Sequence, residues 1–510
     1  MPLNTLVFRP GRTLAARSPL LYGQFIEHFH RQIYGGVYDP QSPFADEDGM
    51  RTDVLDAMRH IHVPILRWPG GCFVSSYHWK KAVGRQRTPV FDKSWRVEDP
   101  NTFGTDEYIS LCRKIGCAPY ICTNAGTGTP EEMSDWVEYC NLDSEGEFAR
   151  WRRENGHPDP YKVRYWSIGN ENYGFWELGA KDAQEWGRLV LESAKLMHHV
   201  DPEIELSAAA LPDLDWNIHL LKACGQHLDW ISIHKYWNLM AQENDFFSYE
   251  ESMACTNDLD TDLRKVRGLL TAMGLEKRIR IAYDEWNLRG WHHPNVHTIR
   301  QGKTPEEYLL PRDKNDINRD YTMADAVFSA CFLNTLNRSC DMVGMAAFAP
   351  IVNTRGCIFT HKDGIVLRST YHVFDLYVNH LGDEILDGWV EEEETMTCRS
   401  RSGRLETVPV LDVLATRRSR DQALVIAAVN KHPSEARTLT LQTEGRLPRS
   451  RFRLLSVTGE STESYNDIGM EQVQLKCTPW QTVTESLCPT LAPHSVSLIE
   501  ILPDTAHSIS

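Results

Sequence analysis

The chain has 510 residues, too many for one small core, and this length predicts two domains. Hydrophobic residues make up 41% and charged residues 24% of it, which is typical of a soluble globular protein. The formal net charge of −16 argues against nucleic-acid binding, because a protein needs clustered Lys and Arg to displace the counterions of a phosphate backbone.

The start of the chain and its cysteines indicate a cytoplasmic protein. The first residues, MPLNTLVFRP, lack the basic and apolar regions of a signal peptide. No run approaches ~18 apolar residues, so no membrane span is expected. The 13 cysteines show no disulfide framework and are expected to be reduced and buried. Neither the spaced Cys112, Cys117 and Cys122 nor His292-His293 has the further ligands of a metal site, so no metal is expected.

Eight short apolar runs alternate with helical patterns between about residues 20 and 380. Runs of this length that are apolar throughout are typical of parallel strands buried on both faces. In chain order they are LYGQFIE (21–27), PILRWPG (64–70), APYICTN (118–124), VRYWSIGN (163–170), IELSAAA (204–210), LDWISIH (228–234), RIRIAYDE (278–285) and MVGMAAFA (342–349). Such an alternation predicts a (β/α)8 barrel with enlarged loops.

Several helices between these runs carry clear start and stop signals. The stretch TPEE (129–132) combines an N-cap, a first-turn proline and a capping-box glutamate. Asp182 and Glu185 repeat the capping box, and a further helix is expected between Thr105 and Gly116.

After about residue 385 the pattern changes to alternating apolar and polar residues. The segments, separated by Gly, Pro and Ser turns, are VPVLDVLATRR, QALVIAAVN, RTLTLQT, RFRLLSVTG and HSVSLIEILP. This pattern is typical of a β-sandwich. We therefore expect a barrel over residues 19–382 and a sandwich over residues 383–510. The strand-like segment within residues 1–18 is expected to pair into the sandwich.

Functional residues of such a barrel lie at the carboxyl ends of its strands. Those ends place two carboxylates, Glu171 and Glu285, at one mouth. Cleavage of a glycosidic bond needs such a pair, because one group protonates the departing oxygen while the other attacks the anomeric carbon or activates water. The other polar residues at strand ends are Glu27, His28, Cys72, Asn124, Asn170, His234, Tyr236 and Asn287. Tryptophans near these ends, whose flat faces suit sugar rings, are Trp95, Trp166, Trp176, Trp237, Trp286 and Trp291.

A purely structural interpretation stays open for each residue taken alone. A glutamate at a strand end is often a solvated or salt-bridged group, and His234 is more often a packed or hydrogen-bonded histidine than a base. Core positions are the alternative for Trp95 and Trp286. The catalytic interpretation is favoured because the two glutamates lie at different strand ends, each beside an asparagine and a tryptophan.

Six stretches resemble the α-L-arabinofuranosidases of glycoside hydrolase family 51. They are GQFIEHFHRQIYGGVYDP (23–40), LRWPGGCFVSSYHW (66–79), FGTDEY (103–108), YWSIGNENYGFW (165–176), ISIHKYW (231–237) and YDEWN (283–287). The resemblance covers nearly the whole chain and, taken together, these motifs are highly specific. It implies a (β/α)8 barrel with a β-sandwich, and removal of terminal arabinofuranosyl groups with retention of configuration and without a cofactor.

Carried over to this sequence, the resemblance implies that Glu171 is the general acid/base and Glu285 the nucleophile. Asn170 would hold the hydroxyl next to the reacting carbon, and Glu27 would hold hydroxyls deeper in the pocket. Tyr236 would orient the nucleophile.

Three further side chains are expected at the sugar. Cys72 would line it as a neutral thiol rather than act as a nucleophile, since no basic residue adjoins it in sequence. Trp95 would cover the pocket, and Trp286 is expected to stack on or enclose the sugar. One position departs from the family pattern: Pro350 stands where many members carry a glutamine that contacts the sugar, and this leaves sugar specificity open.

We therefore expect a retaining, exo-acting enzyme that acts on fragments of arabinan or arabinoxylan. No nucleic-acid or membrane partner is expected, and the family is often homo-oligomeric. Retention requires the two carboxyl groups to lie about 5–5.5 Å apart, and the charge of Glu285 is expected to raise the pKa of Glu171. The alternatives are the same mechanism on another furanoside or a β-linked pyranoside, and a barrel that binds saccharide without cleaving it.

Overall fold

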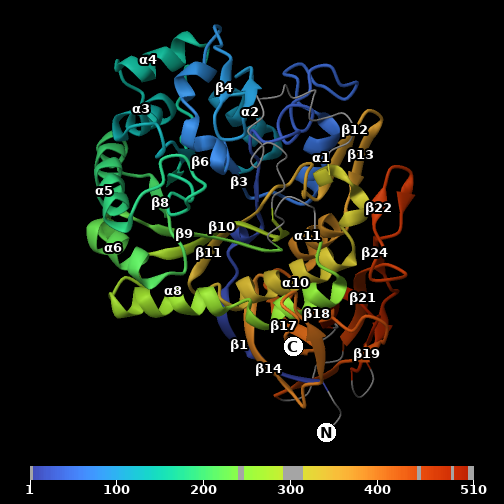
Figure 1. The fold of residues 1–510 in the computed structure, drawn as a ribbon. Coiled ribbons are helices and arrows are strands. Elements are labelled where there is room, and N and C mark those ends of the chain that lie inside the picture. Colours follow the sequence, from blue (N-terminus) through green and yellow to red (C-terminus); the bar gives the residue numbers. More distant parts are fainter. Residues whose placement is uncertain (1–3, 239–245, 291–313, 445–449, 484–486, 504–510) are drawn as a thin grey trace, which may run out of the picture.

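The computed structural model describes residues 4–238, 246–290, 314–444, 450–483 and 487–503 (Figure 1). The sequence-based expectations for Trp291 and His292-His293 lie outside these residues. Within the described ranges, no helix is both long and apolar enough to cross a membrane.

Parallel strands close into a barrel in the order β2-β3-β6-β7-β8-β9-β10-β11, and β11 pairs back with β2. Their bounds are β2 Gly23–Phe25, β3 Ile65–Trp68, β6 Ala118–Thr123, β7 Tyr165–Ile168, β8 Glu205–Ala209, β9 Trp230–Asn238, β10 Arg280–Arg289 and β11 Val343–Phe348. Each strand overlaps one of the eight apolar runs, so the predicted (β/α)8 barrel is confirmed.

The helices predicted from start and stop signals, α2, α3 and α5, are present. The helix bounds are α1 Thr52–His60, α2 Thr105–Ile115, α3 Pro130–Asn141, α4 Glu147–Glu154, α5 Ala183–Val200, α6 Leu214–Cys224, α7 Tyr249–Ala254, α8 Thr261–Ala272, α10 Met323–Arg338 and α11 Ser369–His380. The Thr129 side chain caps α3, and Asp182 forms a capping box on α5. Gly116 ends α2 with a φ of 79°, in the left-handed region that glycine adopts without a steric penalty.

A nine-stranded sheet forms the C-terminal region, in the order β20-β1-β14-β17-β18-β27-β21-β24 with β25 paired to β21. Its bounds are β1 Thr5–Ala16, β14 Glu384–Glu391, β17 Leu411–Arg418, β18 Ala423–Asn430, β20 Thr440–Thr443, β21 Ser450–Thr458, β24 Gln474–Cys477, β25 Gln481–Thr482 and β27 Ser495–Pro503. Strand β1 pairs antiparallel with β14 and parallel with β20. The exact domain boundaries at residues 18 and 382 stay predictions.

Strand β18 is buried along its whole length because apolar cores lie on both of its faces. Successive strand residues face opposite sides. Val425 and Ala427 join the core that continues into the barrel, whereas Ile426 and Ala428 join a second core that includes Phe8 of β1. Each face of β18 thus lies on its own core, one continuous with the barrel and one within the C-terminal region.

Helix α10 lies between the barrel and this sheet. All of its residues from Met323 to Asn337 are buried. The helix contacts β10 of the barrel and β17, β18 and β27 of the sheet. Because α10 is buried on every side, it is part of the core of both units.

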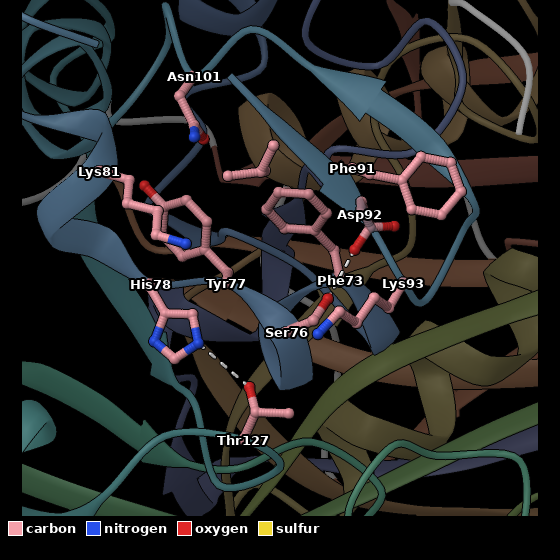
Figure 2. A pocket seen from close by; sticks show the side chains of 11 residues that line it. Phe73, Ser76, Tyr77, His78, Lys81, Phe91, Asp92, Lys93, Asn101 and Thr127 are labelled. Atoms are coloured by element: carbon pink, nitrogen blue, oxygen red, sulfur yellow. Dashed lines mark hydrogen bonds between the residues drawn. The ribbon is translucent and has the colours of Figure 1, made fainter. Parts of the chain in front are cut away.

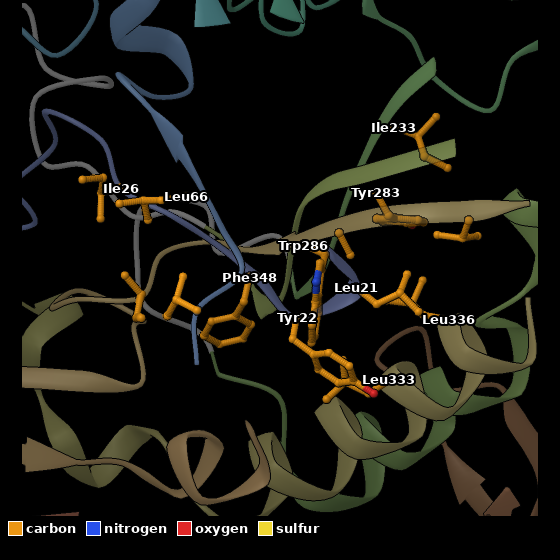
Figure 3. Close-up of a cluster of buried hydrophobic side chains, with 14 of the residues drawn as sticks. Leu21, Tyr22, Ile26, Leu66, Ile233, Tyr283, Trp286, Leu333, Leu336 and Phe348 are labelled. Atoms are coloured by element: carbon orange, nitrogen blue, oxygen red, sulfur yellow. The ribbon is translucent and has the colours of Figure 1, made fainter. Parts of the chain in front are cut away.

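Trp286 points from β10 into the layer between the barrel and α10, not into the barrel mouth (Figure 3). Its side chain is 0% exposed, and its ring centroid lies 4.7 Å from that of Phe332 on α10 and 5.1 Å from that of Phe348 on β11. The structure therefore corrects the expectation that Trp286 encloses a sugar. The reason is strand alternation, since the preceding residue, Glu285, takes the inward face of β10.

Replacing Trp286 by alanine should lower the free energy of unfolding by about 3–5 kcal/mol, because a large buried side chain is removed and a cavity remains. Denaturant unfolding of the two proteins measures this difference. Trp176→Ala is the matched control, because Trp176 is 53% exposed and its loss should change stability little. Equal stability of the Trp286→Ala variant and the parent would contradict the core position.

Candidate active site

One buried arginine organises the centre of the barrel mouth. Arg67, the third residue of β3, is 1% exposed. Its Nη1 donates to Oε2 of Glu285 at 2.8 Å, and its Nη2 donates to Oδ1 of Asn170 at 2.9 Å. This leaves Nδ2 of Asn170, which has no hydrogen-bond partner among the described residues, to donate to a ligand. The sequence analysis did not single out Arg67, although it is the only charge in the run PILRWPG.

Two consecutive carboxylates of β10 reach this arginine. The Nε of Arg67 lies 3.5 Å from Oδ2 of Asp284, the residue before Glu285. Neighbouring residues of a regular strand face opposite sides, but the pairing of β10 with β9 shifts register between Ala282 and Glu285. Burial alone would raise the pKa of Asp284, but Arg67 and His234 lower it to about 2, so Asp284 stays ionised.

The Glu285 carboxylate is held at both oxygens. Arg67 donates to Oε2, and the hydroxyl of Tyr236, on the neighbouring strand β9, donates to Oε1 at 2.6 Å. Glu285 is only 3% exposed. Its orientation is therefore fixed by two donors, one of them a cation.

Glu171 lies at the end of β7 in an unusual backbone conformation. Its φ of 47° is in the left-handed region, which costs a non-glycine residue about 1–3 kcal/mol. Its carboxylate is also held at both oxygens: Nδ1 of His234 lies 2.9 Å from Oε1, and Nε1 of Trp176 donates to Oε2 at 2.9 Å.

The charges around Glu171 and His234 favour an ion pair. Burial alone would lower the pKa of His234, but Glu285, Asp284 and Glu171 raise it to about 10. Burial alone would raise the pKa of Glu171, but the hydrogen bond and charge of His234, with Trp176 and Arg67, lower it. The expectation that Glu285 raises the pKa of Glu171 is therefore corrected, because the protonated imidazole lies between the two carboxylates.

Glu171 and Glu285 are close together. One oxygen of each and one ring nitrogen of His234 all lie within 4.8 Å of one another. A ligand atom that contacts the carboxylate oxygen of one residue can therefore also reach that of the other.

Glu27 lies directly behind a glycine turn. It is 1% exposed, and its Oε1 accepts hydrogen bonds from the Phe73 backbone at 3.1 Å and from Nε1 of Trp95 at 3.0 Å. A Cβ at Gly70, whose φ is 144°, would lie 2.3 Å from Cγ of Glu27. The Gly70-Gly71 pair therefore makes room for Glu27. Burial and the charge of Glu285 raise the pKa of Glu27 well above its usual value.

A small hairpin, β4 (Val90–Asp92) and β5 (Val97–Asp99), carries Trp95 to Glu27. Asp92, 3% exposed, accepts hydrogen bonds from the Trp95 backbone at 2.5 Å and from the Ser76 hydroxyl at 2.7 Å. Burial raises the pKa of Asp92 to about 6. Asp92 and Ser76 line a pocket of about 120 Å³, where Figure 2 shows the Ser76 hydroxyl pointing at the carboxylate. Asp92 thus anchors the hairpin that positions Trp95.

Cys72 and Glu177 form a second acidic pair beside Glu171. Burial, with the charges of Glu177 and Glu171, raises the pKa of Cys72 well above its usual value, as expected for a neutral thiol. Glu177 is 4% exposed, accepts a hydrogen bond from the Ser75 hydroxyl, and has its pKa raised to about 8 by burial. Sequence reasoning missed Glu177, although it lies in the same stretch, RYWSIGNENYGFWELG, as Glu171.

The remaining strand-end residues have structural partners. Nδ1 of His28 lies 2.8 Å from the Asp99 carboxylate, Asn124 binds the Tyr77 carbonyl at 3.0 Å, and Asn287 binds the Ala349 carbonyl at 3.0 Å. Trp166 packs against Trp136. Trp237 packs against Phe328 and Phe332. Pro350 follows β11 and is buried.

Comparison with known proteins gives consistent matches over nearly the whole chain. The family models for the α-L-arabinofuranosidase 1 domain and the α-L-arabinofuranosidase C-terminal domain match residues 57–254 and 284–495. A probable α-L-arabinofuranosidase C of Aspergillus niger is 30% identical and covers 97% of this chain and 96% of its own length. An intracellular exo-α-(1→5)-L-arabinofuranosidase of Halalkalibacterium halodurans is 33% identical, with 84% of each chain covered.

Solved structures agree with these matches. The arabinose complex of the Thermotoga maritima α-L-arabinofuranosidase is 35% identical, with a TM-score of 0.86 over 98% of this chain and 100% of the other. The thermostable family 51 enzyme of Thermotoga petrophila is also 35% identical, with a TM-score of 0.86 and 98% and 99% of the two chains covered.

The geometry around His234 generates a test that needs no substrate. We expect the imidazole resonances of His234 to titrate near pH 10 in an NMR titration, and not near the ordinary value of about 6.5. Glu285→Gln should move this midpoint down, because Glu285 contributes the largest upward shift. Glu192→Gln, which removes an exposed carboxylate on α5, is the matched control and should leave it unchanged. A midpoint near 6.5 in the parent protein would contradict the ion pair.

Proposed function

This chain belongs to the α-L-arabinofuranosidases of glycoside hydrolase family 51, and from this we propose that it removes terminal α-L-arabinofuranosyl groups with retention of configuration. The observation that carries the mechanism is the approach of Glu171 and Glu285 to within 4.8 Å. This supports the short spacing of about 5–5.5 Å that retaining enzymes use, against roughly 6.5–9.5 Å where a water must fit between the groups.

In the first step Glu285 attacks the anomeric carbon. The bond between that carbon and the leaving oxygen breaks, and Glu171 delivers a proton to the oxygen. The two donors on Glu285 favour attack from a fixed direction, since Tyr236 and Arg67 hold its oxygens. In the second step Glu171 takes a proton from water, and the water oxygen displaces Glu285 from the sugar.

We propose that His234 supplies the proton that Glu171 delivers. The free site favours His234 protonated and Glu171 ionised, with 2.9 Å between Nδ1 and Oε1. As Glu285 attacks, it loses its negative charge, which is the main cause of the raised pKa of His234. In the same step the proton passes from His234 through Glu171 to the leaving oxygen. When water hydrolyses the ester, Glu171 takes a proton from that water and passes it to His234, while Glu285 regains its charge.

The other site residues receive binding roles. Asn170 offers its free Nδ2 to the hydroxyl beside the reacting carbon, because Arg67 already occupies its oxygen. Glu27 and Trp95, joined by a hydrogen bond, would hold and cover the far side of the sugar. Cys72 would line the pocket as a neutral thiol.

The substrate and the location are proposed from the relatives. The name of the Halalkalibacterium halodurans protein describes it as intracellular and exo-acting on α-(1→5) linkages, which supports exo-action on arabinan or arabinoxylan fragments in the cytoplasm. Pro350, where family members often carry a sugar-binding glutamine, has no side-chain donor. A panel of aryl furanosides and β-linked aryl pyranosides therefore tests the sugar, and the α-L-arabinofuranoside should be cleaved best.

Replacing Glu285 and replacing Glu171 should reduce activity in different ways. Glu285→Ala should lose activity on every substrate, because no glycosyl-enzyme can form. Glu171→Ala should cleave natural linkages about 10²–10⁴-fold more slowly. It should still form the glycosyl-enzyme from an aryl glycoside whose leaving group needs no proton. Azide should then rescue its turnover and yield a glycosyl azide of retained configuration.

Product configuration decides between the role assignments. Rescue of the Glu285→Ala variant by azide to an inverted product, with no rescue of Glu171→Ala, would reverse the two roles. Sugar binding by the parent protein in calorimetry without any product from the substrate panel would support a saccharide-binding barrel.

Trp95→Ala should lower kcat/KM about tenfold or more, and it should also lower the melting temperature because the Trp95 side chain is only 7% exposed. The kinetic loss is expected because the change uncovers the sugar and removes one of the hydrogen bonds to the buried Glu27 oxygen, a loss of about 1–3 kcal/mol. Trp95→Phe keeps an aromatic ring but removes the N–H, and its kcat/KM should lie between those of the parent and of Trp95→Ala. A large fall in melting temperature with unchanged kinetics would instead make Trp95 a core residue.

A further inference from the structure

The proposed reaction leaves one buried carboxyl group of the mouth unused. Glu177 lies in the loop after β7 and is 4% exposed. Its Oε1 accepts a hydrogen bond from the Ser75 hydroxyl, whereas its Oε2 has no partner among the described residues apart from the neighbouring Cys72 thiol. A buried polar atom without a partner is rare and calls for a ligand or another explanation.

Glu177 belongs to a group of three ligating side chains. Sγ of Cys72, one oxygen of Glu171 and one oxygen of Glu177 all lie within 4.8 Å of one another. In a tetrahedral Zn²⁺ site with Zn–S of about 2.3 Å and Zn–O of about 2.1 Å, neighbouring ligand atoms are ~3.5 Å apart. Side-chain movements of about 1 Å would therefore bring the three atoms onto one ion.

We propose that Cys72, Glu171 and Glu177 form a binding site for a thiophilic divalent cation of the Zn²⁺ class, and that the bound ion reversibly inhibits the enzyme. A thiolate with two carboxylates is a donor set that suits Zn²⁺, with an open fourth position for water. The ion would occupy the oxygen of Glu171 and the thiol beside the sugar. Inhibition rests on the proposed role of Glu171, whereas binding of the ion does not.

A second group of three, Glu171, His234 and Glu285, is equally close but is already saturated. His234 bonds Glu171, and both oxygens of Glu285 accept hydrogen bonds, from Arg67 and from Tyr236. A cation there would have to displace the guanidinium of Arg67, which lies 2.8 Å from Glu285. The Cys72 group is favoured instead, because Oε2 of Glu177 has no hydrogen-bond partner among the described residues outside that group.

Binding of the ion should release protons. A cysteine binds Zn²⁺ as a thiolate, so the ion replaces the thiol proton of Cys72, which passes to the buffer. Affinity should consequently increase with pH.

Calorimetric titration of the chelator-treated full chain with ZnCl₂ tests the site directly. We expect one ion per chain, with protons released in buffers of different ionisation enthalpy. Glu177→Gln should raise the Kd at least tenfold. Cys72→Ser should also raise the Kd at least tenfold and release about one proton fewer, because it removes the thiol. Cys477→Ser, which removes an exposed thiol far along the chain, is the matched control and should bind like the parent.

Inhibition is measured on an aryl α-L-arabinofuranoside. ZnCl₂ should inhibit the parent enzyme at lower concentration at pH 8 than at pH 6, and a chelator should restore activity. Glu177→Gln should keep its activity without metal and need at least tenfold more Zn²⁺ for half-inhibition. MgCl₂ should not inhibit either protein, because Mg²⁺ avoids thiolate ligands.

Three results would overturn the proposal. The first is no calorimetric binding at millimolar ZnCl₂, and the second is equal Zn²⁺ affinity of Glu177→Gln and the parent. The third is Zn²⁺ binding that His234→Asn weakens and Glu177→Gln does not, which would place the ion at the group of Glu171, His234 and Glu285. If Cys72→Ser does not fold, Glu177→Gln decides alone. A parent protein that binds Zn²⁺ at this site but cleaves no substrate would refute the proposed function while leaving the metal site in place.

Discussion

The buried guanidinium of Arg67 is the interaction on which the rest of the barrel mouth depends. A cation this deep in a protein must be compensated, and Asp284, Glu285 and Asn170 surround it. Together the two carboxylates carry one negative charge more than the arginine does. That excess charge is what raises the pKa of His234, and His234 in turn keeps Glu171 ionised in the free site. The protonation states of Asp284, His234 and Glu171 therefore depend on the charges gathered around one residue of β3.

Much of the fold follows from local sequence signals. The eight uniformly apolar runs predicted the barrel strands, and the signals at Thr129 and Asp182 predicted helix starts, because caps and parallel-strand burial depend on nearby residues. The closeness of Glu171 and Glu285 could also be anticipated, since the carboxyl ends of barrel strands meet at one mouth.

The parts of the site that sequence reasoning missed depend on tertiary context. Whether Trp286 faces the sugar or the core depends on the register of β10, which a bulge shifts near Asp284. Glu177 looks in sequence like any loop glutamate, and only the fold buries it beside Cys72. The pKa of Glu171 was expected to shift the wrong way because the approach of His234, from a strand far along the chain, is not visible in sequence.

Helix α10 limits how far this chain can be treated as modular. Its residues from Met323 to Asn337 are all buried, so this part of the helix has no solvent-exposed face. It contacts β10 of the barrel and β17, β18 and β27 of the sheet. Cutting the chain between barrel and sheet would uncover an apolar helix surface and two-sided strands such as β18. The C-terminal sheet is thus an obligate part of the catalytic body, and chimeras within the family would have to exchange the sheet together with α10.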